Sequence, residues 1–254
     1  MRRIAVISDV HGNMTALDAV LAAIERERPD AIVVCGDVAS GPDPAGTVDR
    51  LLALERTHFV RGNADREVLE AFGAGRRFDP ADEQPARRSG AWAAEQLSRP
   101  QRDFLAGFRD TVVLPLDRAG EVLFCHGSPG SDEEIITSLT PERALGRMLA
   151  GVGQPLVVCG HTHVQFSRVW NGIRVVNTGS VGMPYEGRRG AFWLMLEPEV
   201  RFRRTEYDYE LAAQRVLASG YPEAETTRDL ILDPQDPREV EAYFETVAAD
   251  RGER

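Results

Sequence analysis

The 254-residue sequence contains no lysine, and each of its 30 basic residues is an arginine. This absence excludes a Walker A phosphate loop, a kinase-type phosphate lysine, and Schiff-base or pyridoxal chemistry, because each of them needs a lysine amine. The 40 acidic residues outnumber the arginines and give a formal net charge of −10. A surface this acidic argues against general binding to DNA or RNA.

Cysteines and long apolar runs are also scarce. Cys35, Cys125 and Cys159 are the three cysteines, and no two of them lie close together in the sequence. An odd count, and opening residues that lead straight into a predicted strand rather than a secretion signal, predict a reducing, cytoplasmic location with buried thiols. Since no apolar run reaches the roughly 18 residues of a membrane span, we expect no membrane partner.

The first third of the chain alternates short apolar runs with helical spacing. The predicted strands are residues 3–8, 31–35 and 57–60, and the predicted helices between them are residues 14–28 and 45–55. This alternation is typical of a layered α/β fold. It stops at residues 66–108, where helical stretches joined by Gly, Pro and Arg predict a mostly helical cap or insertion.

Strands return in the second half of the chain. They are predicted at residues 112–116, 122–125, 156–159, 165–170, 173–177, 191–196 and 201–207, with a helix at 141–149. Asn171-Gly172 predicts a tight hairpin turn between two of them. We therefore expect a main domain over residues 1–208 and a helical, acidic tail over residues 209–254, with a helix at 237–249.

Four of the five histidines lie in glycine-flanked turns directly after predicted strands; the fifth, His58, is mid-strand and predicted to be structural. Two more turns of this kind carry Asp37 and Asn63. Side chains that follow strands of an open α/β sheet gather at one edge, where ligands bind. The predicted set is Asp9, His11, Asp37, Asn63, His126, His161 and His163.

These seven side chains are too many for a single ion, and no thiolate is placed to join them. Imidazole, carboxylate and amide donors suit two divalent first-row metals, with Asp37 as the natural bridge. Two such ions, about 3.5–4 Å apart, can hold a hydroxide between them and neutralise a phosphoryl group during in-line displacement. Each turn alone is weak evidence, and their joint occurrence favours the two-metal interpretation.

The order of these motifs resembles that of the calcineurin-like metallophosphoesterases. Residues 8–13 (Ser-Asp-Val-His-Gly-Asn) and 177–184 (Asn-Thr-Gly-Ser-Val-Gly-Met-Pro) are similar to the small bacterial and archaeal phosphodiesterase branch. The resemblance covers residues 3–208, apart from most of 66–108. It implies a four-layer αββα sandwich with two metals at one edge of the sheets.

The resemblance also implies roles for individual residues. Asp9, His11, Asp37 and His163 would hold one metal, whereas Asp37, Asn63, His126 and His161 would hold the other. Asn13 would lie within reach of the phosphate. Manganese is the metal we favour; iron, zinc, nickel and cobalt are alternatives in this family.

The sequence departs from the family pattern at two positions. Many members carry a histidine after the Gly-Asn asparagine, where it assists the leaving group, but this chain has Ala64 followed by Asp65. Tyr185 stands where related sequences often have arginine. Arg188 and Arg189, a few residues on, could supply the missing positive charge and bind substrate.

The sequence therefore predicts a metal-dependent phosphodiesterase in which a metal-bridging hydroxide attacks phosphorus in line. Asp37, Asn63 and Asn13 are the predicted catalytic residues, and the expected partner is a small phosphorylated substrate. The alternatives are a phosphomonoesterase, a nucleotide pyrophosphohydrolase, or a non-catalytic scaffold with the same fold. The sequence names neither the physiological substrate nor the oligomeric state.

Overall fold

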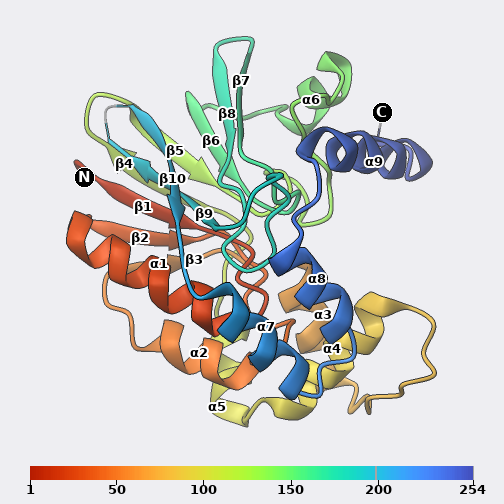
Figure 1. The fold of residues 1–254 in the computed structure, drawn as a ribbon. Coiled ribbons are helices and arrows are strands. Elements are labelled where there is room, and N and C mark those ends of the chain that lie inside the picture. The colour runs from red at the N-terminus through yellow and green to blue at the C-terminus, as the bar shows by residue number, and fades with distance from the viewer. Residues whose placement is uncertain (198, 254) are drawn as a thin grey trace.

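Two five-stranded sheets form the centre of the computed structural model, which describes residues 1–197 and 199–253 (Figure 1). Residues 198 and 254, which belong to the predicted main domain and tail, lie outside the described residues. The first sheet has the order β10 (Val200–Thr205), β9 (Ala191–Leu196), β1 (Ile4–Ile7), β2 (Ala31–Val34), β3 (Thr57–Phe59). The second has the order β4 (Val112–Leu116), β5 (Gly120–Phe124), β6 (Leu156–Cys159), β8 (Ile173–Asn177), β7 (Phe166–Trp170).

Each sheet has a parallel centre and antiparallel edges. In the first sheet β1, β2 and β3 are parallel, whereas β9 and β10 are antiparallel additions. In the second, β5, β6 and β8 are parallel, and β4 and β7 pair antiparallel at the edges. The β7–β8 hairpin turns at Asn171 and Gly172, both with positive φ, as the sequence predicts. Parallel strands bring their carboxyl ends to the same edge of each sheet.

The two sheets pack face to face, and side chains alternate between this interface and the helices outside. Ile4 and Val6 of β1 belong to the core between the sheets, together with Phe124 and Val158 of the second sheet. Their neighbours Ala5 and Ile7 belong to the core beneath the helices. This period of two is what a strand buried on both faces requires. The predicted αββα layering is therefore confirmed.

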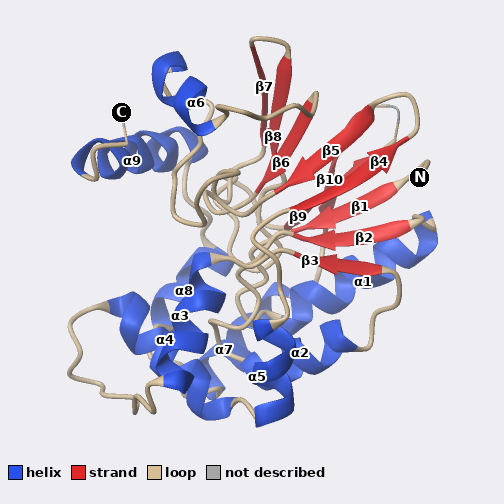
Figure 2. Cartoon of the chain, turned by 180° about the vertical axis from the view of Figure 1, so that it is seen from behind, coloured by secondary structure: helices blue, strands red, loops and turns tan. Residues whose placement is uncertain are grey.

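One helical layer lies against the first sheet and extends beyond it (Figure 2). It consists of α1 (Met14–Glu27), α2 (Pro44–Leu52), α3 (Asn63–Gly73), α4 (Pro85–Gln96) and α5 (Arg99–Ala106). The last three confirm the helical character of residues 66–108. Their buried side chains, including Trp92 of α4 and Leu105 of α5, share one core with α1 and α2. The insertion is thus packed on the main body, and its predicted action as a cap stays a prediction.

The outer face of the second sheet is covered by α6 (Glu142–Met148). Leu145 and Met148 of this helix pack with Cys125 and Cys159, while Cys35 lies in the core between the sheets. All three thiols are free and fully buried, so their predicted packing role is confirmed. In the described part of the chain, no helix is both long and apolar enough to cross a membrane.

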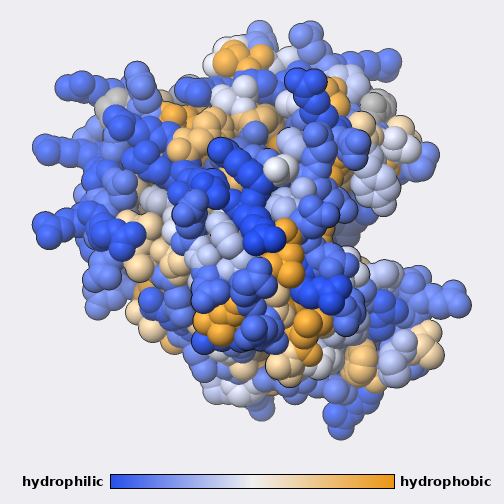
Figure 3. Space-filling view, viewed as in Figure 1, coloured by the Kyte–Doolittle hydropathy of each residue, from blue (hydrophilic) through white to orange (hydrophobic). Residues whose placement is uncertain are grey.

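The described part of the tail forms three helices, of which the sequence located only the last. They are α7 (Tyr209–Ala218), α8 (Ala224–Leu232) and α9 (Pro237–Asp250). The first two pack together near the helical layer, whereas α9 crosses to the side of α6 (Figure 1). The surface is hollowed at the right of Figure 3, between α9 above and the α3–α4 region below. The acidic tail is therefore an ordered part of the fold.

Candidate metal centre

The predicted ligands all follow the carboxyl ends of parallel strands. Asp9 and His11 follow β1, Asp37 follows β2, and Asn63 begins α3 after β3. From the second sheet, His126 follows β5, and His161 and His163 follow β6. Both sheets therefore supply side chains to one shared edge, while His58 lies inside β3.

The backbone adopts a rare conformation at five of these positions. Positive φ angles occur at Asp9 (55°), His11 (44°), Asp37 (55°), His161 (67°) and His163 (60°). A side chain in the left-handed region is normally uncommon, and such strain gathers at functional sites. The strand ends are therefore shaped to aim side chains at a common point rather than to make ordinary turns.

Two glycines make room for this arrangement between β2 and β3. A Cβ on Gly62 would lie 2.1 Å from Asp37 Oδ1, and one on Gly36 would lie 2.5 Å from the Gly62 nitrogen. Gly36 also has a φ of +92°. A side chain at either position would displace the Asp37 carboxylate, which explains why both turns contain glycine.

The first group of side chains is Asp9, His11 and His163, whose ligand atoms lie within 4.8 Å of one another. His163 Nε2 is 3.2 Å from Asp9 Oδ1 and 3.3 Å from His11 Nε2. The Asp9 side chain is fully buried and His163 is nearly so. Two imidazole nitrogens and one carboxylate oxygen thus converge on one point.

The second group is Asp37, His126 and His161, which meets the same distance criterion. His126 Nε2 is 3.3 Å from Asp37 Oδ2 and 3.1 Å from Asn63 Oδ1, so the asparagine joins this group. Asp37 Oδ2 is also 3.8 Å from His11 Nε2 of the first group. Asp37 therefore lies between the groups, where the sequence placed the bridge.

The donor atoms fit metal ions. Asp9 Oδ1 is buried and has no hydrogen-bond partner of regular geometry among the described residues, although His163 Nε2 lies 3.2 Å away. A buried carboxylate oxygen of this kind is costly unless a cation balances it. In each of the three imidazoles of His11, His126 and His163, Nδ1 lies 2.6–3.1 Å from a backbone carbonyl oxygen. That contact fixes the ring and leaves Nε2 facing the centre, as in metal-binding histidines.

The electrostatics of the centre favour ionised carboxylates. Burial alone would raise the pKa of Asp37, but the charges of His126 and His11 hold it well below its usual range. The same competition, between burial and the charge of His163, lowers the pKa of Asp9. Anionic carboxylates are the form that binds a metal.

The imidazoles divide into two kinds. Burial lowers the pKa of His161 to about 4, and burial also lowers the pKa of His11. Burial acts in the same direction on His126, but the charge of Asp37 and a hydrogen bond to it raise this pKa to about 10. A cation at the second group would take the place of that proton.

Asp65 organises the backbone around Asp37 rather than facing substrate. This fully buried carboxylate accepts N–H bonds from Asp37 (2.9 Å) and Gly62 (3.1 Å) on Oδ2, and from Val38 (2.9 Å) on Oδ1. The Ala64 N–H donates in turn to Asp37 Oδ1 at 2.8 Å. The Asp after Gly-Asn-Ala is therefore a support for the bridging residue.

The segment 177–184, which carries part of the family resemblance, links the loops of the two sheets. Ser180 Oγ and Gly182 N both donate to the Asp9 carbonyl, at 2.7 and 2.9 Å. Asn177 Nδ2 donates to Gly160 O and to Thr162 Oγ1. These bonds fix the strand-end loops of the first and second sheets relative to each other.

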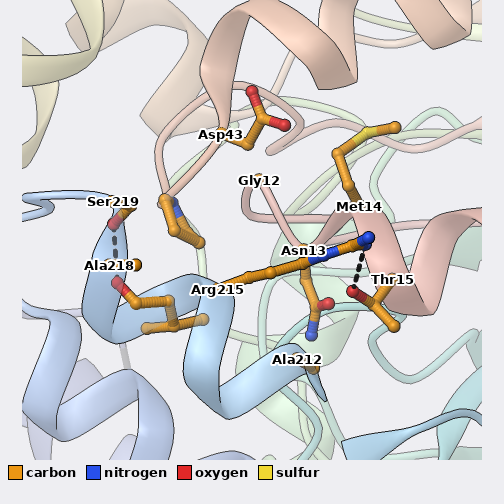
Figure 4. A pocket seen from close by; sticks show the side chains of 11 residues that line it. Gly12, Asn13, Met14, Thr15, Asp43, Ala212, Arg215, Ala218 and Ser219 are labelled. Atoms are coloured by element: carbon orange, nitrogen blue, oxygen red, sulfur yellow. Dashed lines mark hydrogen bonds between the residues drawn. The ribbon is translucent and has the colours of Figure 1, made fainter.

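Asn13 has structural tasks in addition to its predicted phosphate contact. Its Oδ1 accepts the Ala16 N–H and caps α1, and its Nδ2 donates to Gly182 O, each at 3.1 Å. It also lines a cavity of about 400 Å³ with Asp43 and Arg215 (Figure 4). Because both ends of the amide have protein partners, the contact with phosphate stays a prediction.

Arg188 and Arg189 are not among the side chains that the structure gathers at the metal centre. The Arg188 guanidinium lies over the Phe192 ring. Arg189 donates to the Leu232 carbonyl at 2.7 Å and lies over the Tyr209 ring. Both are exposed, and the described contacts of Arg189 tie it to the tail helices, so their substrate role stays a prediction.

Three other side chains near the centre were not among the predicted ligands. Tyr185 stacks on His163 with ring centroids 5.0 Å apart and an interplanar angle of 15°. Phe244 of α9 lies 6.4 Å from His161, and Glu67 of α3 has its pKa raised to about 7 by burial and by the charge of Asp37. None of them lies in a glycine-flanked turn. Only the departure at Tyr185 was visible beforehand.

The profile of the calcineurin-like phosphoesterase superfamily domain matches residues 1–198. An uncharacterized protein of Methanocaldococcus jannaschii is 26% identical over 247 residues, covering 87% of this chain and 94% of its own length.

Two solved structures share the architecture over nearly their full length. A metallophosphoesterase from Sphaerobacter thermophilus has a TM-score of 0.71 at 28% identity, covering 89% of this chain and 97% of its own. A hypothetical protein from Pyrococcus horikoshii has a TM-score of 0.75 at 18% identity, covering 93% of this chain and 100% of its own. At 18% identity, the likeness to the Pyrococcus horikoshii protein is a likeness of fold alone.

Proposed function

Since the chain belongs to the calcineurin-like phosphoesterase superfamily, we propose that it is a phosphodiesterase that uses two divalent ions, with Mn²⁺ as the favoured metal. The family fold implies divalent metals, and the chain has two groups of side chains able to hold them. The proposed partner is a small phosphorylated substrate. A cytoplasmic location belongs to the same proposal, because all three cysteines are free thiols.

The observation that carries this proposal is the position of Asp37 between the two groups. Its Oδ2 lies 3.3 Å from a nitrogen of one group and 3.8 Å from a nitrogen of the other. If both ions were bound, this single carboxylate could serve as a ligand to each of them. When bound, such a pair supplies an activated water and positive charge for the phosphoryl oxygens.

The protein's own groups hold and orient this chemistry. Asp9, His11, Asp37 and His163 would hold one ion, and Asp37, Asn63, His126 and His161 the other. The backbone carbonyls of Ser40, Cys35 and Met183 fix three of the imidazoles, so little reorganisation is needed during the reaction.

The preference for diesters follows from the region around Ala64. Ala64 has no proton to donate, and both oxygens of Asp65 are occupied by backbone N–H groups. A leaving group of high pKa benefits most from a positioned acid. We therefore favour activated diesters over alkyl monoesters, while a phosphomonoesterase or nucleotide pyrophosphohydrolase is the alternative that a substrate panel distinguishes.

The direct test is metal dependence. Hydrolysis of bis(4-nitrophenyl) phosphate should disappear with chelator and return with Mn²⁺, and a panel of diesters, monoesters and dinucleotides should rank the diesters first. Full activity in metal-free protein would contradict the proposal. Greater turnover of alkyl monoesters than of diesters would replace it with the alternative.

A further inference from the structure

A second cavity adjoins the metal centre, between the loop after β8 and α9. Its volume is about 320 Å³, within the range of about 300–1,000 Å³ that is usual for small-molecule sites. Three aromatic residues (Tyr185, Tyr243 and Phe244) and two carboxylates (Asp236 and Glu239) line it. None of these residues has a role in the chemistry described above.

The aromatic side chains connect this cavity to the predicted metal ligands. Tyr185 stacks on His163 and lies 6.4 Å, centroid to centroid, from Phe244. Phe244 is also 6.4 Å from His161 and 6.1 Å from Tyr243. A substrate with its phosphate at the metals therefore has an aromatic wall beside it.

The wall is held in place by the opposite face of α9. Glu245, buried in this helix, accepts hydrogen bonds from the hydroxyls of Thr137 and Thr140. Glu241, one turn earlier, accepts the backbone N–H and the hydroxyl of Ser138, each at 2.8 Å. Residues 239, 240, 243 and 244 form the cavity face, as helical spacing requires. The helix thus presents this face in a fixed position.

Tyr243 is the most informative residue of the wall. Its exposed fraction is 67%, whereas a large aromatic side chain normally buries most of its surface. Small-molecule sites are typically lined by aromatic side chains, and Tyr243 belongs to such a lining together with Tyr185 and Phe244. The ring is therefore available to contact a ligand.

The charge of the cavity excludes some ligands and favours others. Its described lining has two carboxylates and no basic side chain, so the phosphate itself is repelled toward the metal centre. Carboxylates accept N–H donors, and aromatic rings stack on flat heterocycles. A nucleobase meets both conditions.

We propose that this cavity binds the base of a nucleotide whose phosphodiester lies at the metal centre, with Tyr243 as the stacking platform. The proposal rests on the proposed function for the reaction itself. In this proposal, the tail helix α9 selects among phosphodiesters by the nucleoside or alkyl group that is esterified to the phosphate.

The test compares esters that share one leaving group. Mn²⁺-loaded wild type should hydrolyse thymidine 5′-(4-nitrophenyl phosphate) with a kcat/KM at least about tenfold above that of ethyl 4-nitrophenyl phosphate. Tyr243→Ala should lower this ratio about tenfold, which corresponds to about 1.4 kcal/mol. Tyr243→Phe should retain it, because the ring remains.

A matched control is Phe202→Ala, which removes an aromatic side chain that is 41% exposed on β10. The ratio should stay at the wild-type value. An equal loss on both esters, or an unchanged ratio in Tyr243→Ala, would overturn the proposal. The proposal would also be overturned if Tyr243→Ala lost more kcat/KM on 4-nitrophenyl phosphorylcholine than on the thymidine ester. The cavity would then be a site for a cationic head group.

A binding measurement separates this proposal from the proposed function. Thymidine 5′-monophosphate and ethyl phosphate are titrated calorimetrically into the Mn²⁺-loaded protein. Tyr243→Ala should weaken the binding of the nucleotide about tenfold and the binding of ethyl phosphate much less. This result supports the base site even if the wild type hydrolyses none of the esters. The absence of hydrolysis would refute only the proposed phosphodiesterase activity. Equal affinity of wild type and variant for the nucleotide would contradict the base site.

Discussion

The strand-end loops and the α9 wall both adjoin the metal centre, yet they are built in different ways. The loops contain five predicted ligands with positive φ, and backbone hydrogen bonds hold them tightly. The wall is a regular helix held by side-chain contacts through Glu241 and Glu245. The strand-end loops need a strict geometry for one chemistry. The residues of α9 can change without disturbing that geometry. We expect the loops to determine the reaction and α9 to determine the substrate.

The comparison is tested most strongly at Asp37. Asp37→Ala should lower kcat/KM for bis(4-nitrophenyl) phosphate by on the order of 10³-fold or more, because the carboxylate that would be shared by the two ions is lost. Asn13→Ala should cost less, since it removes mainly a helix cap. Steady-state kinetics with saturating Mn²⁺ measure both. A smaller loss in Asp37→Ala than in Asn13→Ala would show that Asp37 is not the bridge.

Asp65 tests whether the loops depend on buried backbone support. Asp65→Asn would turn an amide donor toward backbone N–H groups, so the free energy of unfolding should fall by about 3 kcal/mol. Mn²⁺ affinity should weaken by roughly 10- to 100-fold. Urea unfolding and metal titration provide the two values. Asp110→Asn, at a carboxylate that is 80% exposed and pairs with Arg61, is the control: it should lower the free energy of unfolding by less than about 1 kcal/mol and leave Mn²⁺ affinity unchanged.

Ala64 tests the absence of a positioned acid in the loops. Ala64→His should raise turnover of esters with high-pKa leaving groups by roughly tenfold and that of nitrophenyl esters little. The measurement is a plot of log kcat against leaving-group pKa for both proteins. Equal slopes would mean that another group already protonates the leaving group, and Glu67 would be the first residue to substitute.

The smallest effect is expected in the support of α9. Glu241→Ala removes two hydrogen bonds to Ser138 and should reduce the preference for nucleoside over ethyl esters by about two- to fivefold. The number of bound Mn²⁺ ions should not change. A loss of metal from this variant would show that the two regions are not independent.

The sequence located the strand-end loops because the pattern that marks them is local. Each predicted ligand lies in a short turn after a predicted strand, and five of the seven are next to a glycine, so candidates such as Asp37 and His126 could be named without a structure. The layered fold followed from the same alternation. The spacing of residues 237–249 also predicted a helix, now seen as α9.

What the sequence did not predict depends on contacts between distant segments. Phe244 reaches His161 across more than 80 positions, and Glu245 reaches Thr137 across 108. Nothing in the spacing of the tail indicates which loop it meets. The support role of Asp65 was hidden for a different reason, since backbone N–H groups give no residue-specific signal.

The central claim is that the strand-end side chains hold two ions and that both are needed for diester hydrolysis. It is tested most directly by adding Mn²⁺ stepwise to chelator-treated protein while bound metal and activity on bis(4-nitrophenyl) phosphate are measured in the same samples. We expect about two ions per chain in the wild type, with activity appearing as the second ion binds, and fewer than two in Asp37→Ala. Full activity before any metal binds, or two ions held equally well by Asp37→Ala, would contradict the account.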